Sequence, residues 1–176
     1  MRTNQGASRQ AMEASGIIMS IRPEHAFDIM SGRKTVELRR RFPERVQMGS
    51  LILIYASSPE QRLVGAARIE DVRRMTPAGL WRSFRERACI ERSLFDDYFN
   101  GASEGVGVML GACVRFAEPI PVSELRERFR FFPPQSYRYI RGPLTSLWND
   151  ERIQVPDRHE HRDRSGGQPS GRDRTY

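Results

Sequence analysis

The feature that most constrains the fold is an apolar run at residues 51–56, Leu-Ile-Leu-Ile-Tyr-Ala. A Gly-Ser pair precedes it and Ser57-Ser58-Pro59 follows it, so turn-forming residues bound the run on both sides. A short run that is apolar at every position is typical of a strand buried on both faces, at the centre of a sheet. Other elements must therefore cover both faces of this sheet. Ser57 lies where the strand meets a loop, which is a usual position for ligand contacts.

The rest of the chain supplies elements for such a cover. Periodicity and turn signals predict strands at residues 17–21, 34–39, 63–72 and 106–116, the last strand of the chain, and helices at 23–30, 77–88, about 91–100 and 123–129. Pro23 starts the first helix, a Ser-Gly pair ends it, and Ser123 caps the last one. A glycine within the strand 63–72 is expected where a barrel wall bends. The aromatic residues of the two middle helices recur at helical spacing, which favours a place in the core.

Length and composition predict one globular domain with loose ends. A chain of 176 residues suffices for one domain with a proper core but not for two. We expect residues 1–15 to be a flexible leader, 16–148 the domain, and 149–176 a disordered polar tail. The aromatic-rich segment 131–139 either closes one end of a barrel or forms part of a binding surface. No apolar run approaches the roughly 18 residues that span a bilayer, so we expect a cytoplasmic protein.

The basic residues single out Lys34. The formal net charge of +7 and a pI near 10.2 favour an anionic partner such as nucleic acid. Lys34 is the single lysine among 29 basic residues, and the others are all arginine. An ammonium group can lose its proton when it is desolvated, whereas a guanidinium stays charged, so Lys34 is the first candidate for chemistry. The cysteines and histidines are too isolated to predict a metal site.

Lys34 belongs to the stretch 31–39, Ser-Gly-Arg-Lys-Thr-Val-Glu-Leu-Arg, which leaves the first helix through a turn. Strict strand alternation places Lys34 on the same face as Val36 and Leu38, near the mouth of a cavity, and points Glu37 to the opposite face. A twist or a bulge would bring Lys34 and Glu37 together instead. The pattern leaves both arrangements open.

Gly32, Lys34, Glu37 and Arg39 make a G-x-K-x-x-E-x-R motif, and with a helix before it and an apolar strand after it the chain resembles the ASCH domain family. The resemblance covers roughly residues 17–147, and the helices of its second half resemble the longer prokaryotic variety. It implies an α+β fold, a small PUA-like β-barrel of about five to six mostly antiparallel strands with helices packed at its ends. It also implies a cleft beside the motif and an association with RNA and with regulation of transcription.

The resemblance also implies possible enzymatic activities. Some small ASCH proteins hydrolyse the amide of N4-acylated cytidines with a lysine, a threonine and a glutamate. Lys34 matches the lysine, but Glu37 stands at the threonine position, and Glu86 and Glu91 are the candidates for the glutamate. Because acyl transfer needs a nucleophilic hydroxyl, this departure counts against the same mechanism. Ribonuclease activity is also attributed to ASCH proteins, and it can be metal-free.

Three hypotheses follow for the motif. The first is a binding module whose basic cleft holds RNA, a nucleotide or a nucleoside. The second is a metal-independent hydrolase of RNA or of an acylated nucleoside that uses Lys34 and Glu37, with Tyr55 and Ser57 in secondary roles. The third is an internal ion pair that ties the first helix to the sheet. The candidate binding residues are Arg33, Lys34, Glu37, Arg39, Arg40, Arg41, Tyr55, Ser57, Gln135, Ser136 and Arg138. We expect a monomer with no cofactor, no metal and no membrane partner.

Overall fold

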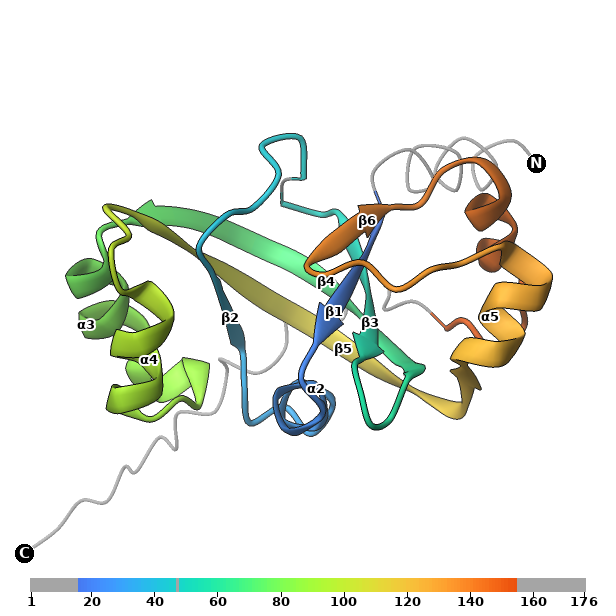
Figure 1. The fold of residues 1–176 in the computed structure, drawn as a ribbon, viewed down its shortest axis with the longest axis horizontal. Coiled ribbons are helices and arrows are strands. Elements are labelled where there is room, and N and C mark those ends of the chain that lie inside the picture. The colour runs from blue at the N-terminus through green and yellow to red at the C-terminus, as the bar shows by residue number, and fades with distance from the viewer. Residues whose placement is uncertain (1–15, 47, 155–176) are drawn as a thin grey trace, which may run out of the picture.

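The computed structural model describes residues 16–46 and 48–154, which form one curled six-stranded sheet with helices around it (Figure 1). The expected leader and most of the expected tail lie outside the described residues. The elements are β1 (Ile17–Ile21), α2 (Pro23–Met30), β2 (Val36–Arg39), β3 (Leu51–Ala56), β4 (Arg62–Met75), α3 (Pro77–Ala88), α4 (Arg92–Phe99), β5 (Gly105–Pro121), α5 (Val122–Phe129), β6 (Tyr137–Tyr139) and the 3-10 helix η1 (Gly142–Asn149).

The sheet is a half-barrel with the order β2-β5-β4-β3-β1-β6. The apolar strand β3 lies inside it, between β4 and β1, and every one of its residues is buried, as its sequence predicts. Strand β1 pairs with β3 in parallel, and the other neighbours are antiparallel. The α+β class and the mostly antiparallel barrel-like sheet expected from the sequence are confirmed.

Helices cover both ends and the lower edge of the sheet in Figure 1. At one end, α3 and α4 pack on β2 through a cluster of buried apolar side chains: Val36, Leu38, Leu80, Phe84, Ala88, Phe95 and Phe99. At the other end, α5 and η1 pack on a second cluster that includes Leu125, Phe129, Leu144 and Trp148. Helices packed at the ends of the barrel are therefore confirmed. Among the described residues, no helix combines the length and apolar character needed to cross a bilayer.

Two glycines explain how α2 fits beneath the sheet. Gly32 has φ +78°, a left-handed conformation that favours glycine, and it reverses the chain after α2. In β4, a Cβ atom on Gly65 would lie 2.2 Å from Met30 Sδ and 2.4 Å from the Val114 carbonyl oxygen. A side chain at Gly65 would therefore clash with the backbone of β5 and displace the Met30 side chain, which α2 places against this part of the sheet. The strand register also shifts between Leu63 and Gly65, in agreement with the expected bend.

Three local predictions need correction. Strand β5 extends to Pro121 and is followed by β6, so the run 106–116 is not the last strand. Strand β6 was missed because it has only three residues, and it exists because residues 137–139 pair with β1. Helix α5 begins at Val122 with Pro121 as its N-cap residue, so Ser123 lies inside the helix and does not cap it.

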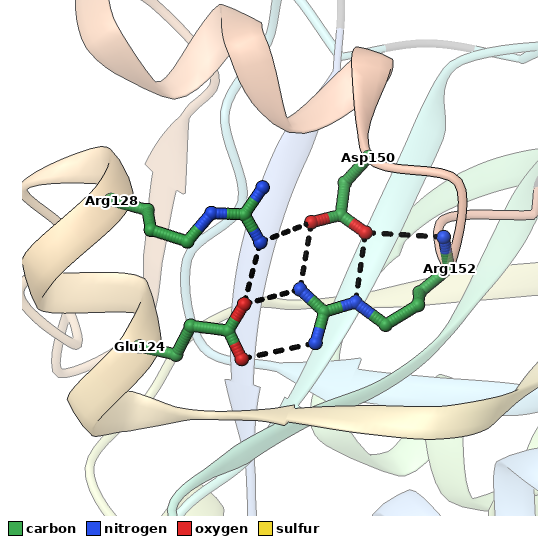
Figure 2. A network of polar contacts seen from close by, with 4 residues as sticks. All are labelled: Glu124, Arg128, Asp150 and Arg152. Carbon is green, nitrogen blue, oxygen red and sulfur yellow. Dashed lines mark hydrogen bonds and ion pairs between the residues drawn. The ribbon is translucent and has the colours of Figure 1, made fainter.

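Residues 149–154, which were expected to belong to the polar tail, contact α5 through a group of four charged side chains that we call the C-terminal network (Figure 2). Its members are Glu124, Arg128, Asp150 and Arg152. Asp150 Oδ2 lies 2.8 Å from Arg128 Nη1, and Arg152 Nη1 donates to Glu124 Oε2 at 3.0 Å. The network joins the end of η1 to helix α5.

Candidate functional site

A cavity of about 840 Å³ lies where α2, β2, α4 and the segment 133–135 meet. This volume falls within the range of about 300–1,000 Å³ that is usual for small-molecule sites. Its lining residues are Ser20, Ile21, Arg22, His25, Lys34, Glu37, Leu38, Arg39, Tyr55, Ser57, Ser58, Gln61, Ile90, Leu94, Asp97, Tyr98, Arg126, Pro133, Pro134 and Gln135. The segment 131–139 adds strand β6 to the sheet, and its residues Pro133, Pro134 and Gln135 line the cavity.

Lys34, Glu37 and Arg39 form a buried ion trio in the wall of this cavity. Glu37 Oε2 lies 3.4 Å from Lys34 Nζ, and Glu37 Oε1 lies 3.0 Å from Arg39 Nε. The side chains of the three residues are 3%, 8% and 11% exposed, in the same order. Lys34 Nζ also donates to the carbonyl oxygen of Ala88, at the end of α3. The trio is therefore held by its own charges and by a helix terminus, and it carries one excess positive charge.

Arg39 also connects the trio to two other segments. Its contact with Glu37 is an ion pair without hydrogen-bond alignment at Nε, and its hydrogen bonds are made by the terminal nitrogens. Nη2 donates to the carbonyl oxygen of Ser20 at 2.8 Å, and Nη1 donates to Ser136 Oγ at 3.5 Å. Arg39 thus ties β2 to the end of β1 and to the segment before β6.

Lys34 and Glu37 converge because β2 begins after Lys34. The backbone N–H of Lys34 donates to the Asp28 carbonyl oxygen, and that of Thr35 donates to the Arg87 carbonyl oxygen. These bonds fix residues 34 and 35 between α2 and α3, outside the alternation of the strand. Of the two arrangements that the sequence left open, the strict-alternation one is wrong and the convergent one is present.

The rest of the cavity wall adds positive charge. Arg22, at the start of α2, and Arg126, on α5, are exposed and make no ion pair within the part of the chain that the structure describes. Asp97 is the one carboxylate in the wall besides Glu37. Four cationic side chains therefore face two carboxylates, and two of the four cations are unpaired. Such a wall favours an anionic ligand.

His25 is a wall residue that the sequence pattern leaves isolated. Its imidazole is half-buried, and Nδ1 is buried without a hydrogen-bond partner among the described residues. Burial, followed by the nearby charge of Lys34, lowers the pKa of His25 below its ordinary value of 6.5. The imidazole is therefore neutral at pH 7 and can accept a proton. In the sequence, the one signal that could have identified His25 is its position on the helix that leads directly into the motif.

Tyr55 is another titratable group of the wall whose surroundings shift its pKa. It is 2% exposed at the end of β3, and its ring packs edge-on against Phe131 with centroids 5.3 Å apart. Burial raises the pKa of the Tyr55 hydroxyl above 10.0, so the hydroxyl stays protonated and can donate a hydrogen bond. Ser57, next along the wall, is fixed by its backbone N–H, which donates to the carbonyl oxygen of Ile21 at 2.9 Å.

The structure divides the candidate residues from the sequence into three groups. The cavity wall holds Lys34, Glu37, Arg39, Tyr55, Ser57 and Gln135. A second hollow beside it holds Arg40, Arg41 and Ser136. Arg33 and Arg138 line neither space, because Arg33 pairs with Asp28 on the surface and Arg138 is exposed on β6. Sequence reasoning missed Arg22, His25, Tyr98 and Arg126, which separate parts of the fold bring to the wall.

Metal-binding residues do not gather at this site. Within residues 16–46 and 48–154, no group of three or more His, Cys, Asp or Glu side chains is arranged to hold a metal ion. The carboxylates of the wall are Glu37, which is already engaged by two cations, and Asp97.

Comparisons with known proteins agree with this fold. Residues 19–115 match the model of the ASCH domain family. An "ASCH domain-containing ribonuclease" from Zymomonas mobilis is 34% identical over 129 residues, which cover 73% of this chain and 86% of that protein. The crystal structure of ASCH from Zymomonas mobilis has a TM-score of 0.71 at 31% identity, covering 77% of this chain and 94% of the other. A serine-to-alanine variant of the Zymomonas mobilis protein has a TM-score of 0.72 at 30% identity, covering 78% and 96%.

Proposed function

The chain belongs to the ASCH domain family, and from that premise we propose that it binds RNA in the cavity beside the ion trio and cleaves it. The observation that carries this proposal is the wall itself. It combines two unpaired arginines, a neutral imidazole and a protonated phenol around one space of nucleotide size. The Zymomonas mobilis relative is named a ribonuclease, which supports the choice of RNA as the substrate.

The charges of the wall support binding of a phosphodiester. Guanidinium groups match phosphate oxygens in geometry, and Arg22 and Arg126 have no competing carboxylate among the described side chains. The ion trio adds one fixed positive charge in a position of low dielectric, where it acts strongly on a bound anion. We therefore assign phosphate binding to Arg22 and Arg126, and we assign Lys34, Glu37 and Arg39 to setting the charge of the wall.

The proton-transfer groups support cleavage through the ribose 2′-hydroxyl. In this reaction His25 takes the 2′-hydroxyl proton, the 2′-oxygen attacks phosphorus, and the 5′-oxygen of the next nucleotide leaves and is protonated by solvent. Tyr55 donates a hydrogen bond to a phosphate oxygen while its charge grows. The products are a 2′,3′-cyclic phosphate and a 5′-hydroxyl end. His25 and Tyr55 are the catalytic residues of this scheme.

The experiment uses a fluorescent DNA oligonucleotide that contains a single ribonucleotide, because it offers one 2′-hydroxyl. Wild-type protein should cut it only at the ribonucleotide, at the same rate with EDTA and with added magnesium. His25→Asn should lower the rate at least about 100-fold, while Arg85→Ala should keep the wild-type rate. Arg85 is exposed on α3 and lines neither hollow.

The pH dependence sharpens this test. Because the pKa of His25 is lowered, the neutral base persists below pH 6.5, and the rate should fall with decreasing pH with a midpoint below 6.5. A rate that depends on magnesium would contradict the metal-independent scheme. Cleavage at deoxynucleotides would contradict the 2′-hydroxyl mechanism. RNA binding without any cleavage by the wild type would leave a binding module as the function.

Hydrolysis of an acylated cytidine has less support as an alternative. Glu37 stands where that activity would need a threonine hydroxyl, and both of its oxygens are engaged in the ion trio. The two candidate glutamates, Glu86 and Glu91, are exposed and line neither hollow. Incubation with N4-acetylcytidine separates the two activities, since RNA cleavage predicts no release of acetate.

A further inference from the structure

A second hollow of about 630 Å³ lies beside the cavity and has no role in the scheme above. Its wall contains Arg40, Arg41, Tyr98, Ser136 and the loop that joins α4 to β5. Tyr98 lines both spaces, and Ser136 accepts a hydrogen bond from Arg39, which lines the cavity. The two spaces are therefore adjacent, with Tyr98 on their common border.

The charges of the second hollow are available to a ligand. Arg40 and Arg41 are exposed, and their guanidinium groups make no ion pair in the described stretch of the chain. Arg39, the preceding residue, is buried and paired with Glu37. The three consecutive arginines therefore divide into one that builds the cavity wall and two that face the neighbouring hollow. Glu104 is the one carboxylate in this second wall, so it retains an excess of positive charge.

Tyr98 is fixed in place while its ring stays accessible. The backbone N–H of Arg40 donates to the Tyr98 hydroxyl at 3.2 Å, and the ring packs edge-on against Phe99 with centroids 4.9 Å apart. The residue is nevertheless 39% exposed. An immobilised, exposed aromatic ring beside unpaired arginines is the combination that binds single-stranded nucleic acid, because bases stack on the ring and phosphates contact the cations.

We infer that the hollow of Arg40, Arg41 and Tyr98 is a second nucleotide subsite, so that the protein takes single-stranded RNA of at least two nucleotides rather than a free nucleoside. This inference rests on the proposed function, because it extends the ligand from the cavity into the neighbouring space. The base of a nucleotide that adjoins the cleaved bond stacks on Tyr98, and the neighbouring phosphate of the strand, not the one that Arg22 and Arg126 bind, lies between Arg40 and Arg41.

The experiment measures how affinity depends on ligand length. The probes are fluorescein-labelled 2′-O-methyl uridine oligomers of one to six nucleotides, which lack a free 2′-hydroxyl within the chain and stay intact during the measurement. Wild-type affinity should rise at least tenfold between one and three nucleotides. Arg40→Ala with Arg41→Ala should abolish this rise and leave mononucleotide affinity unchanged. The slope of log affinity against log salt should fall by about 0.7 for each phosphate that the double variant no longer neutralises.

Tyr98 provides a matched pair of variants. Tyr98→Phe keeps the ring and should retain the length dependence, whereas Tyr98→Ala should lose at least fivefold affinity for the trinucleotide. A rise with length that survives in the double arginine variant would overturn the second subsite. An equal loss for mononucleotide and trinucleotide would overturn the separation of the two spaces. Wild-type protein that binds none of the probes would overturn the proposed function itself.

Discussion

The ion trio and the C-terminal network are both clusters of alternating charge, but they differ in balance and in surroundings. The trio has two cations to one carboxylate and lies in the wall of a cavity. The network has two cations and two carboxylates, and its members point toward one another between α5 and the end of η1 (Figure 2). Both clusters are dense in ion pairs, but the trio leaves an excess positive charge beside a hollow and the network does not. In the proposed function, this excess charge and not the ion pairing attracts RNA.

The largest expected decrease in stability comes from a substitution in the ion trio. Glu37→Gln should lower the free energy of unfolding by about 3–5 kcal/mol, because it leaves the buried charges of Lys34 and Arg39 without their counter-ion. Lys34→Met should cost less, since Glu37 keeps its contact with Arg39. Urea denaturation measures both. A decrease of less than about 1 kcal/mol for Glu37→Gln would show that the trio does not hold this part of the fold together.

A smaller effect is expected for the network. Asp150→Ala should lower the free energy of unfolding by about 2 kcal/mol, because it removes charge-assisted hydrogen bonds to Arg128 and Arg152 from a side chain that is 3% exposed. RNA affinity should not change, because the network lines neither hollow. An affinity decrease that exceeds the decrease in folded protein would break the distinction between the two clusters.

The network should also make the free energy of unfolding depend on pH in the acid range. Hydrogen bonds from Arg152 and then Arg128 lower the pKa of Glu124 from 4.5 to about 2. Because the pKa of Glu124 is lower in the folded protein than in the unfolded one, its ionised carboxylate stabilises the fold at pH values above 4.5. This contribution disappears as the pH falls from 4.5 toward 2. Glu124→Gln should therefore reduce the acid-dependent loss of stability by about 1 kcal/mol, after allowance for its partial exposure. Urea titrations between pH 6 and pH 2 measure this difference, and identical pH profiles would contradict it.

The parts of the fold that the sequence predicted are those with local signals. Strand β3 is a continuous apolar run, and α2 and α3 begin at prolines and have apolar faces, so neighbouring residues suffice to define them. Strand β6 has three residues and depends on pairing with β1, which lies more than a hundred residues earlier. Its existence depends on tertiary contact, and local pattern does not reveal it.

The candidate site divides in the same way, into residues that the local sequence identified and residues that only the fold brings together. The motif spacing identified Lys34, Glu37 and Arg39, but their convergence depends on bonds that hold residues 34 and 35 between α2 and α3, which the local pattern does not reveal. Arg22 and Arg126 come from different elements and differ from the paired arginines only in lacking a partner. The phosphate-binding role that we propose for them depends on their distance from the carboxylates, which only the folded structure gives. Likewise, the folded structure is needed to see that Arg39 pairs with Glu37 while Arg40 and Arg41 face the second hollow.

The most direct measurement compares Arg126→Ala with Arg128→Ala, two residues apart on α5. Arg126 lines the cavity and has no ion-pair partner among the described residues, whereas Arg128 is engaged by Glu124 and Asp150. With folded protein confirmed for each variant, the affinity for a labelled, uncleavable RNA should fall about fivefold for Arg126→Ala, equivalent to about 1 kcal/mol. It should stay at the wild-type value for Arg128→Ala. Equal decreases in both variants, or no decrease in either, would contradict the claim that the unpaired cations of the cavity bind RNA.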